Sequence, residues 1–266
     1  MADPSLPPAG SVILWAVKRS SQSERAEARR TTPAAMEAWI RRALLERADR
    51  RFAEGQRRFF RHEVKTYGVR GDAVKEIARQ VAGEINPWPP ERREELMERL
   101  WKRGTLESGA IVCHVMRGFA RTFGEREFLL FEKWLDRYVC NWAHCDGVAS
   151  WLVAGCVAND PSLLGRVWRW TDSPNRWKRR AAAVSLLQEA RRGRHTEFVL
   201  RVAERLLPER DDMVEKGVGW LLKEAYPPRP ADIAGFLLRE GHRASRLTLR
   251  YAAEKMTAAD RRKVLG

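Results

Sequence analysis

The sequence predicts an all-α protein, an α-solenoid built from stacked helix pairs, and three observations lead to this fold class. Helical stretches of roughly 10–18 residues follow one another through the chain, separated by Pro, Gly or Asp. The alternation of polar and apolar residues that is typical of half-buried strands is almost absent. The later helices are expected to begin near residues 161, 174, 194, 212, 230 and 245, at spacings of 13 to 20 residues.

Two helices at this spacing form a repeat of about 35–40 residues, which is the scale of HEAT-type repeats. We therefore expect HEAT-like helix pairs that curve and present a concave face. A globular helical bundle is the alternative, because the similarity between successive repeats is weak.

The expected helices carry residues that favour helix ends. Thr32 is the expected N-cap of the first helix, with Pro33 at its first position. The helix that contains RWKRRAAAVSLL is expected to begin at Ser173, before Pro174, and to end at Gly193.

The chain of 266 residues divides into a short arm and one repeat domain. Residues 1–32 mix Pro, Ser and charged residues without a lasting period, so we expect an N-terminal arm that is partly disordered. Residues 33–266 are enough to bury a large core. The N-terminal apolar run is short and no basic region precedes it, and no segment is long enough to span a membrane. The protein is therefore expected in the cytoplasm.

The charge of the chain predicts its class of partner. Lys and Arg number 50 against 35 Asp and Glu, which gives a net charge of +15. Such an excess attracts a polyanion, which could be DNA, RNA or an anionic membrane surface. On a curved solenoid, a basic concave face would form a groove able to hold a duplex. A basic protein without such a partner is the alternative.

The four cysteines predict neither a disulfide framework nor a metal site. Cys113, Cys140, Cys145 and Cys156 show no C-x-x-C spacing. Cys140 and Cys145 lie close to His144, but zinc sites have other spacings and a fourth ligand. We expect buried, reduced thiols, no metal and no cofactor.

Three segments could carry chemistry, and the first is NWAHCD. Asn141 is a good N-cap, which places Trp142 in the first helical turn and Asp146 four residues later on the same face. The helix dipole favours an ionised carboxylate at this end. Asp146 could serve a site, or it could simply cap the helix or pair with an arginine.

The second segment is RWKRRAAAVSLL, in which three arginines surround Trp177 at the start of an almost wholly apolar helix. Arg176, Arg179 and Arg180 need anionic partners if this helix is nearly buried. The partners could be phosphates or Asp146. A solvated helix end is the alternative.

The third segment is EKGVGWLLKEAY, which places Lys216, Trp220 and Lys223 at positions i, i+4 and i+7. One helix face then presents a cation, an aromatic ring and a second cation. This pattern suits a groove that binds a nucleic-acid backbone. A core tryptophan with snorkelling lysines is an equally good interpretation.

Together these segments resemble the AlkD-type DNA alkylation repair glycosylases, a family of HEAT-like, all-helical enzymes. The resemblance extends from about residue 50 to 256 and begins with RFFRHEVKTYGVRG. It assigns the family's Trp-x-x-x-Asp pair to Trp142 and Asp146, its pocket arginine to Arg180 and its second pocket tryptophan to Trp220.

The sequence departs from the family pattern at two positions. Lys223 stands where arginine is usual, so a bidentate phosphate contact is lost there. Phe59 stands at the position of the pocket tyrosine and cannot hydrogen-bond. The expected DNA-binding residues are Arg176, Arg179, Lys216, Lys223 and Phe59.

The resemblance implies a monofunctional glycosylase that removes cationic N3- or N7-alkylpurines from duplex DNA, as a monomer and without flipping the base. Asp146 would stabilise the oxocarbenium-like transition state and position water. Trp142 and Trp220 would offer π faces to the sugar and the lesion, and Arg180 would orient the carboxylate. Two alternatives remain: a HEAT-repeat protein that binds damaged or branched DNA without cutting it, and a protein scaffold, whose surface should be less basic.

Overall fold

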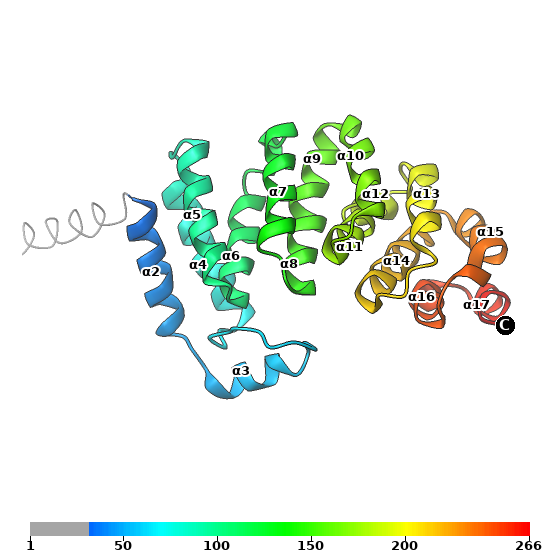
Figure 1. The fold of residues 1–266 in the computed structure, drawn as a ribbon, viewed down its shortest axis with the longest axis horizontal. Coiled ribbons are helices and arrows are strands. Elements are labelled where there is room, and N and C mark those ends of the chain that lie inside the picture. The colour runs from blue at the N-terminus through cyan, green and yellow to red at the C-terminus, as the bar shows by residue number, and fades with distance from the viewer. Residues whose placement is uncertain (1–31) are drawn as a thin grey trace, which may run out of the picture.

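The computed structural model describes residues 32–266, and over this range the chain forms an all-α solenoid (Figure 1). Helices are arranged in two rows along a curved path from α2 to α17. Within the described residues, the only β-type contact outside helices is an isolated bridge between Lys65 and Thr105. The helices are α2 (Pro33–Leu45), α3 (Arg50–Arg57), α4 (Gly71–Ile85), α5 (Pro90–Arg103), α6 (Leu106–Arg117), α7 (Glu125–Arg137), α8 (Trp142–Gly147), α9 (Ala154–Asn159), α10 (Leu164–Arg169), α11 (Arg176–Val184), α12 (Leu187–Arg191), α13 (Thr196–Leu206), α14 (Asp212–Ala225), α15 (Pro230–Glu240), α16 (Arg246–Ala252) and α17 (Ala258–Leu265).

The inner row follows the concave side of the curve. Its helices α4, α6, α8, α11, α14 and α16 pack against one another in this order. The other row includes α5, α7, α10, α13 and α15. Helix α3 is set apart from both rows, below the N-terminal part of the inner row in Figure 1, and the chain after it returns to α4. The predicted solenoid of helix pairs is thus confirmed, and the inner row provides a wall for a site.

Local capping explains where many helices begin. Thr32 accepts a hydrogen bond from the Ala35 amide and starts α2, as expected. The helix expected from Ser173 begins at Arg176 instead, because Asn175 is its cap and accepts from the Trp177 amide. Ser173 instead accepts a hydrogen bond from the Asn175 amide in the preceding turn.

One continuous core of buried apolar side chains runs through the solenoid from Met36 to Met256. A close contact between two helices lies where α14 crosses α16. A Cβ atom on Gly219 would lie 2.5 Å from Cβ of Tyr251 and 2.9 Å from the carbonyl oxygen of Thr248. The two helices can approach this closely only because Gly219 has no side chain.

Several expectations concern the ends and the surface of the chain. Apart from Thr32, the expected arm of residues 1–32 lies outside the described residues. Among the described helices, none has the length and apolar character needed to cross a membrane. In the same part of the chain, no group of three or more His, Cys, Asp or Glu side chains is placed to hold a metal ion.

The cysteines are free thiols, and three of them are buried. The expectation of a buried thiol is wrong for Cys140, which is exposed. Cys140 directly precedes the cap of α8, in the connection from α7, where the chain runs along a surface cavity rather than through the core.

Candidate functional site

Helix α8 positions the Trp–Asp pair. The side chain of Asn141 accepts a hydrogen bond from the His144 amide at 2.9 Å and so caps this helix. Trp142 and Asp146 follow on one face, as the sequence predicts. A π-helical stretch, Val148–Val153, continues α8 into α9. Such stretches are frequent at functional sites.

Asp146 is held in place by one arginine of α11. Nε of Arg180 donates to Oδ1 at 2.7 Å and Nη2 donates to Oδ2 at 2.8 Å, which is the bidentate geometry of a strong ion pair. Nη1 of Arg180 donates to the carbonyl of Met213 in α14. Burial opposes the charge of the guanidinium, but the hydrogen bonds and charge of Asp146 outweigh it and raise the pKa of Arg180. The sequence suggested phosphates or Asp146 as the partner of this arginine, and in the structure Arg180 pairs with Asp146.

A cavity of about 570 Å³ lies next to this ion pair, on the concave side. Asp146 lines it together with Trp142, Trp220 and Phe59, so four of the expected site residues share one space. The Asp146 side chain remains 17% exposed, which leaves the carboxylate accessible from the cavity.

Three aromatic residues of this cavity were missed from the sequence. Phe60 stacks on Trp142, with ring centroids 5.2 Å apart and planes at 15°. Trp151 and His114 contact each other at 4.8 Å between centroids. Burial and the neighbouring charges of Lys75 and Arg117 lower the pKa of His114.

The position of one of these three residues, Phe60, could have been inferred from the sequence. Phe60 is adjacent to Phe59 in a segment already compared with the family. Trp151, by contrast, follows Trp142 by nine residues, and an α-helix turns by about 100° per residue, so the two rings should face opposite ways. The π-helical stretch unwinds the helix by part of a turn before Trp151, and the apolar run itself gives no sign of that change.

A second cavity, of about 810 Å³, shares Phe60 and Trp142 with the first one in its lining. Phe59 borders both spaces, and its side chain is 77% exposed. Arg176 and Lys216, two of the expected DNA-binding residues, line this second cavity. Because the two cavities share these aromatic residues, we treat them as one broad site.

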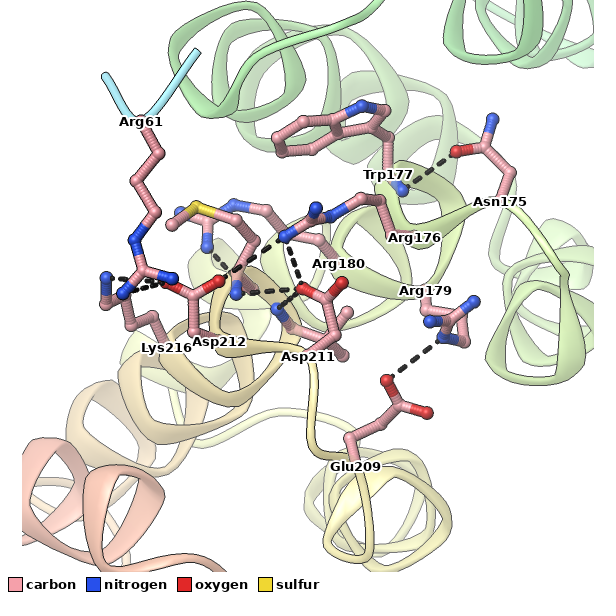
Figure 2. A network of polar contacts seen from close by, with 12 residues as sticks. Arg61, Asn175, Arg176, Trp177, Arg179, Arg180, Glu209, Asp211, Asp212 and Lys216 are labelled. Atoms are coloured by element: carbon pink, nitrogen blue, oxygen red, sulfur yellow. Dashed lines mark hydrogen bonds and ion pairs between the residues drawn. The ribbon is translucent and has the colours of Figure 1, made fainter.

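Two other expected DNA-binding residues line neither cavity. Nε of Arg179 donates to Glu209 at 3.1 Å, and its Nη1 donates to the carbonyls of Ser173 and Pro174. Figure 2 shows Arg179 directed towards Glu209 and away from Arg176. Lys223 forms an ion pair with Glu254 near the end of α16.

Comparison with known proteins identifies the family of this chain. The family model described as DNA alkylation repair enzyme matches residues 40–256. The chain belongs to the DNA alkylation repair enzyme family. A solved structure titled as a predicted DNA alkylation repair enzyme from Enterococcus faecalis has a similar fold, with a TM-score of 0.72 and 15% sequence identity. The match covers 80% of this chain and 98% of that chain. No curated protein matches the sequence.

The matched range includes every residue that lines the two cavities of this alkylation repair enzyme. Its role is therefore in the repair of alkylated DNA, and the broad site on the concave side lies within the part of the chain that defines the family.

Proposed function

We propose that this enzyme is a monofunctional DNA glycosylase that hydrolyses the N-glycosidic bond of cationic N3- or N7-alkylpurines in duplex DNA. One observation carries the proposal. Asp146 is fixed by both nitrogens of the Arg180 fork at the edge of a cavity that Trp142 and Trp220 also line.

A cationic base needs little help to leave, because the electron pair of the breaking C–N bond neutralises its charge. The enzyme must instead stabilise the positive sugar and deliver water to its C1′ atom. A preorganised carboxylate does the first by electrostatics. Each oxygen of Asp146 uses one lone pair on Arg180 and keeps another, which can accept a hydrogen bond from the attacking water.

The two tryptophans are supported so that their rings can face a cationic group. Phe60 stacks on Trp142 and holds its plane. Nε1 of Trp220 donates to Glu224 at 3.2 Å. Burial opposes ionisation of Glu224, but hydrogen bonds and charges of Arg191 and Lys255 lower its pKa to about 2. Trp220 is thus anchored to a carboxylate that stays ionised at neutral pH. Cation–π attraction to a purinium ring would follow.

The proposal includes cleavage without base flipping. Asp146, Trp142 and Trp220 lie on helices of the inner row, where a duplex on the concave side could contact them. The expected contacts to the DNA backbone come from the basic residues around the second cavity.

Asp146→Asn tests the proposal because it keeps the size of the side chain and removes its charge. Single-turnover base release from methylated duplex DNA should fall by about 10²–10³-fold, while affinity for the duplex changes far less. Asp172→Asn is the matched control, because it removes a carboxylate that pairs with Arg205 at the exposed surface.

Loss of Asp146 also leaves Arg180 buried without its partner, so the variant could lose stability. Arg180→Lys controls for this effect, because it keeps Asp146 and a positive charge beside it, while it breaks the fork and the hydrogen bond to the Met213 carbonyl. Thermal unfolding shows whether each variant is folded at the temperature of the assay. Near-normal base release by folded Asp146→Asn would exclude the proposed role. Duplex binding by the unaltered enzyme without any base release would identify a non-cutting DNA-binding protein.

A further inference from the structure

The second cavity contains a carboxylate surrounded by cations from three parts of the fold. Asp212 begins α14, and its Oδ2 lies 3.3 Å from Nη2 of Arg61 and 3.2 Å from Nζ of Lys216. Its Oδ1 lies 3.4 Å from Nη2 of Arg176, the first residue of α11. Figure 2 shows these three side chains converging on Asp212. Arg61 comes from the segment after α3, so the cluster joins the N-terminal part of the solenoid to α14.

The carboxylates only partly satisfy the cations. Arg176 uses one nitrogen, Nη2, for both Asp212 and Asp211, whereas its Nε is buried and has no hydrogen-bond partner. Asp211 is also committed to capping α14, because its Oδ1 accepts from the Met213 amide at 2.9 Å. A guanidinium offers five donors in a fixed fork, and Nη1 of Arg176 makes no hydrogen bond with the described residues, so this group is left for a larger anion.

The surroundings favour an anion. Six Lys or Arg side chains line this cavity, but only two carboxylates do, those of Glu63 and Asp212. The cavity also shares Trp142 with the space next to Asp146. An anionic group bound here would lie beside the proposed reaction centre, as the backbone of a bound strand must.

We propose that Arg61, Arg176 and Lys216 form a binding site for one backbone phosphate of duplex DNA, and that Asp212 fills this site in the free protein. The inference rests on the proposed function only in taking DNA as the ligand. A phosphodiester carries the same single negative charge as Asp212 but presents tetrahedral oxygens to Arg and Lys donors. A phosphate in place of the carboxylate would again give the three cations an anionic partner.

The exposure of the partners allows this exchange. The Arg61 side chain is 72% exposed and can turn towards a ligand, whereas Asp212 is 17% exposed and enclosed by the cations. In the free protein, Asp212 also holds the segment of Phe59, Phe60 and Arg61 against α14. DNA would therefore compete with a carboxylate of the protein, and removal of that carboxylate should strengthen binding.

The test measures affinity for undamaged duplex DNA by fluorescence anisotropy over a range of NaCl concentrations. Asp212→Asn should bind about 3–10-fold more tightly than the unaltered protein at low salt, because the competing charge is gone. Asp172→Asn changes the net charge equally at an ion pair outside both cavities, and it should alter affinity by less than about twofold. Arg61→Ala and Lys216→Ala should each weaken binding and lower the slope of log K against log salt by about one.

The Arg61→Ala variant keeps the test decisive even if Asp212→Asn folds poorly, because Arg61 is largely exposed. Thermal unfolding reports on the folding of each variant. The inference is overturned if folded Asp212→Asn binds no more tightly than Asp172→Asn, or if Arg61→Ala leaves the salt slope unchanged. Base release is not part of this readout. If the binding changes occur as expected but no base is released, the phosphate site is retained and the glycosylase is excluded. If base release is normal but Asp212→Asn has no effect on binding, only the phosphate site is excluded.

Discussion

His144, two residues before Asp146, is held as a neutral imidazole at the contact of α6 and α8. Its Nε2 donates to the carbonyl of Leu106 at 3.3 Å, which makes Nδ1 the acceptor for the Asn141 amide at 3.0 Å. Burial lowers the pKa of His144 to about 4, and the nearby charge of Glu107 only partly offsets this effect. Protonation would remove one of the two hydrogen bonds and place a charge in the core.

This residue should make stability depend on pH. The unfolded chain binds a proton at His144 near pH 6.5, but the folded chain binds it only near pH 4. The unfolded state therefore holds more protons between these values, so the free energy of unfolding falls as the pH falls from 6.5 to 4. The loss is on the order of 3 kcal/mol. Urea unfolding at several pH values measures it.

His144→Gln provides the comparison, because it removes the titrating ring and keeps a polar side chain. The difference between the two pH curves isolates His144 from His114, whose lowered pKa acts in the same direction. Glu224 titrates well below this range, at a pKa of about 2. An unchanged pH dependence in the variant would contradict the prediction.

At the scale of the element, α14 brings together the two cavities and the packing of the inner row. Asp212, Lys216 and Trp220 face the cavities, whereas Gly219 faces α16. Gly217 makes room for Arg180, since a Cβ there would lie 3.3 Å from Cγ of that arginine. Because Gly219 has no side chain, α14 packs closely on α16, and this packing sets the position of Trp220 on the same helix.

Gly219→Ala should be destabilising, although alanine favours a helix by about 1 kcal/mol over glycine. The added methyl would meet Tyr251 at 2.5 Å and the Thr248 backbone at 2.9 Å, so α14 and α16 must separate. Overpacking of this kind costs about 1–3 kcal/mol, measured by chemical unfolding. Gly83→Ala in α4 is the matched control, because within the described chain the new methyl group would meet no side chain and no other helix within 4 Å. It should be neutral or stabilising, and equal effects of the two substitutions would refute the packing argument.

At the scale of the whole molecule, the broad site on the concave side predicts which lesions are accepted. An enzyme that flips a base into a fitted pocket rejects adducts too large for that pocket. Here two cavities of about 570 and 810 Å³ share Phe60 and Trp142 in their linings. Bulky cationic N3 or N7 adducts should therefore be released within about tenfold of the rate for the methyl lesion, a barrier difference near 1.4 kcal/mol.

Single-turnover assays on duplexes with each adduct measure these rates. Uracil and hypoxanthine should not be released, because neutral bases need protonation as they leave. Efficient release of uracil would refute the prediction. Release of methyl adducts with bulky cationic adducts left intact would refute it as well.

The sequence by itself determined the order of the helices and the beginning of α8, the helix that carries Trp142 and Asp146. Caps such as Thr32 and Asn141 act through hydrogen bonds to residues only three positions away. Helical spacing also places Trp142 and Asp146 on one face without reference to the rest of the fold. The cap expected at Ser173 lies two residues too early, because another capping residue, Asn175, follows close behind it.

Only the tertiary structure decided which charges meet. Arg176, Arg179 and Arg180 lie within five residues of one another, yet Arg180 pairs with Asp146, Arg179 with Glu209 and Arg176 with the acids of α14. The rotation of α11 against its neighbours selects among them. The contact of Arg61 with Asp212 depends further on the curvature of the whole solenoid, which sums many helix packings. Capping depends on adjacent residues, but long-range pairing depends on helix phase and curvature, and these are set by the packing of the entire core.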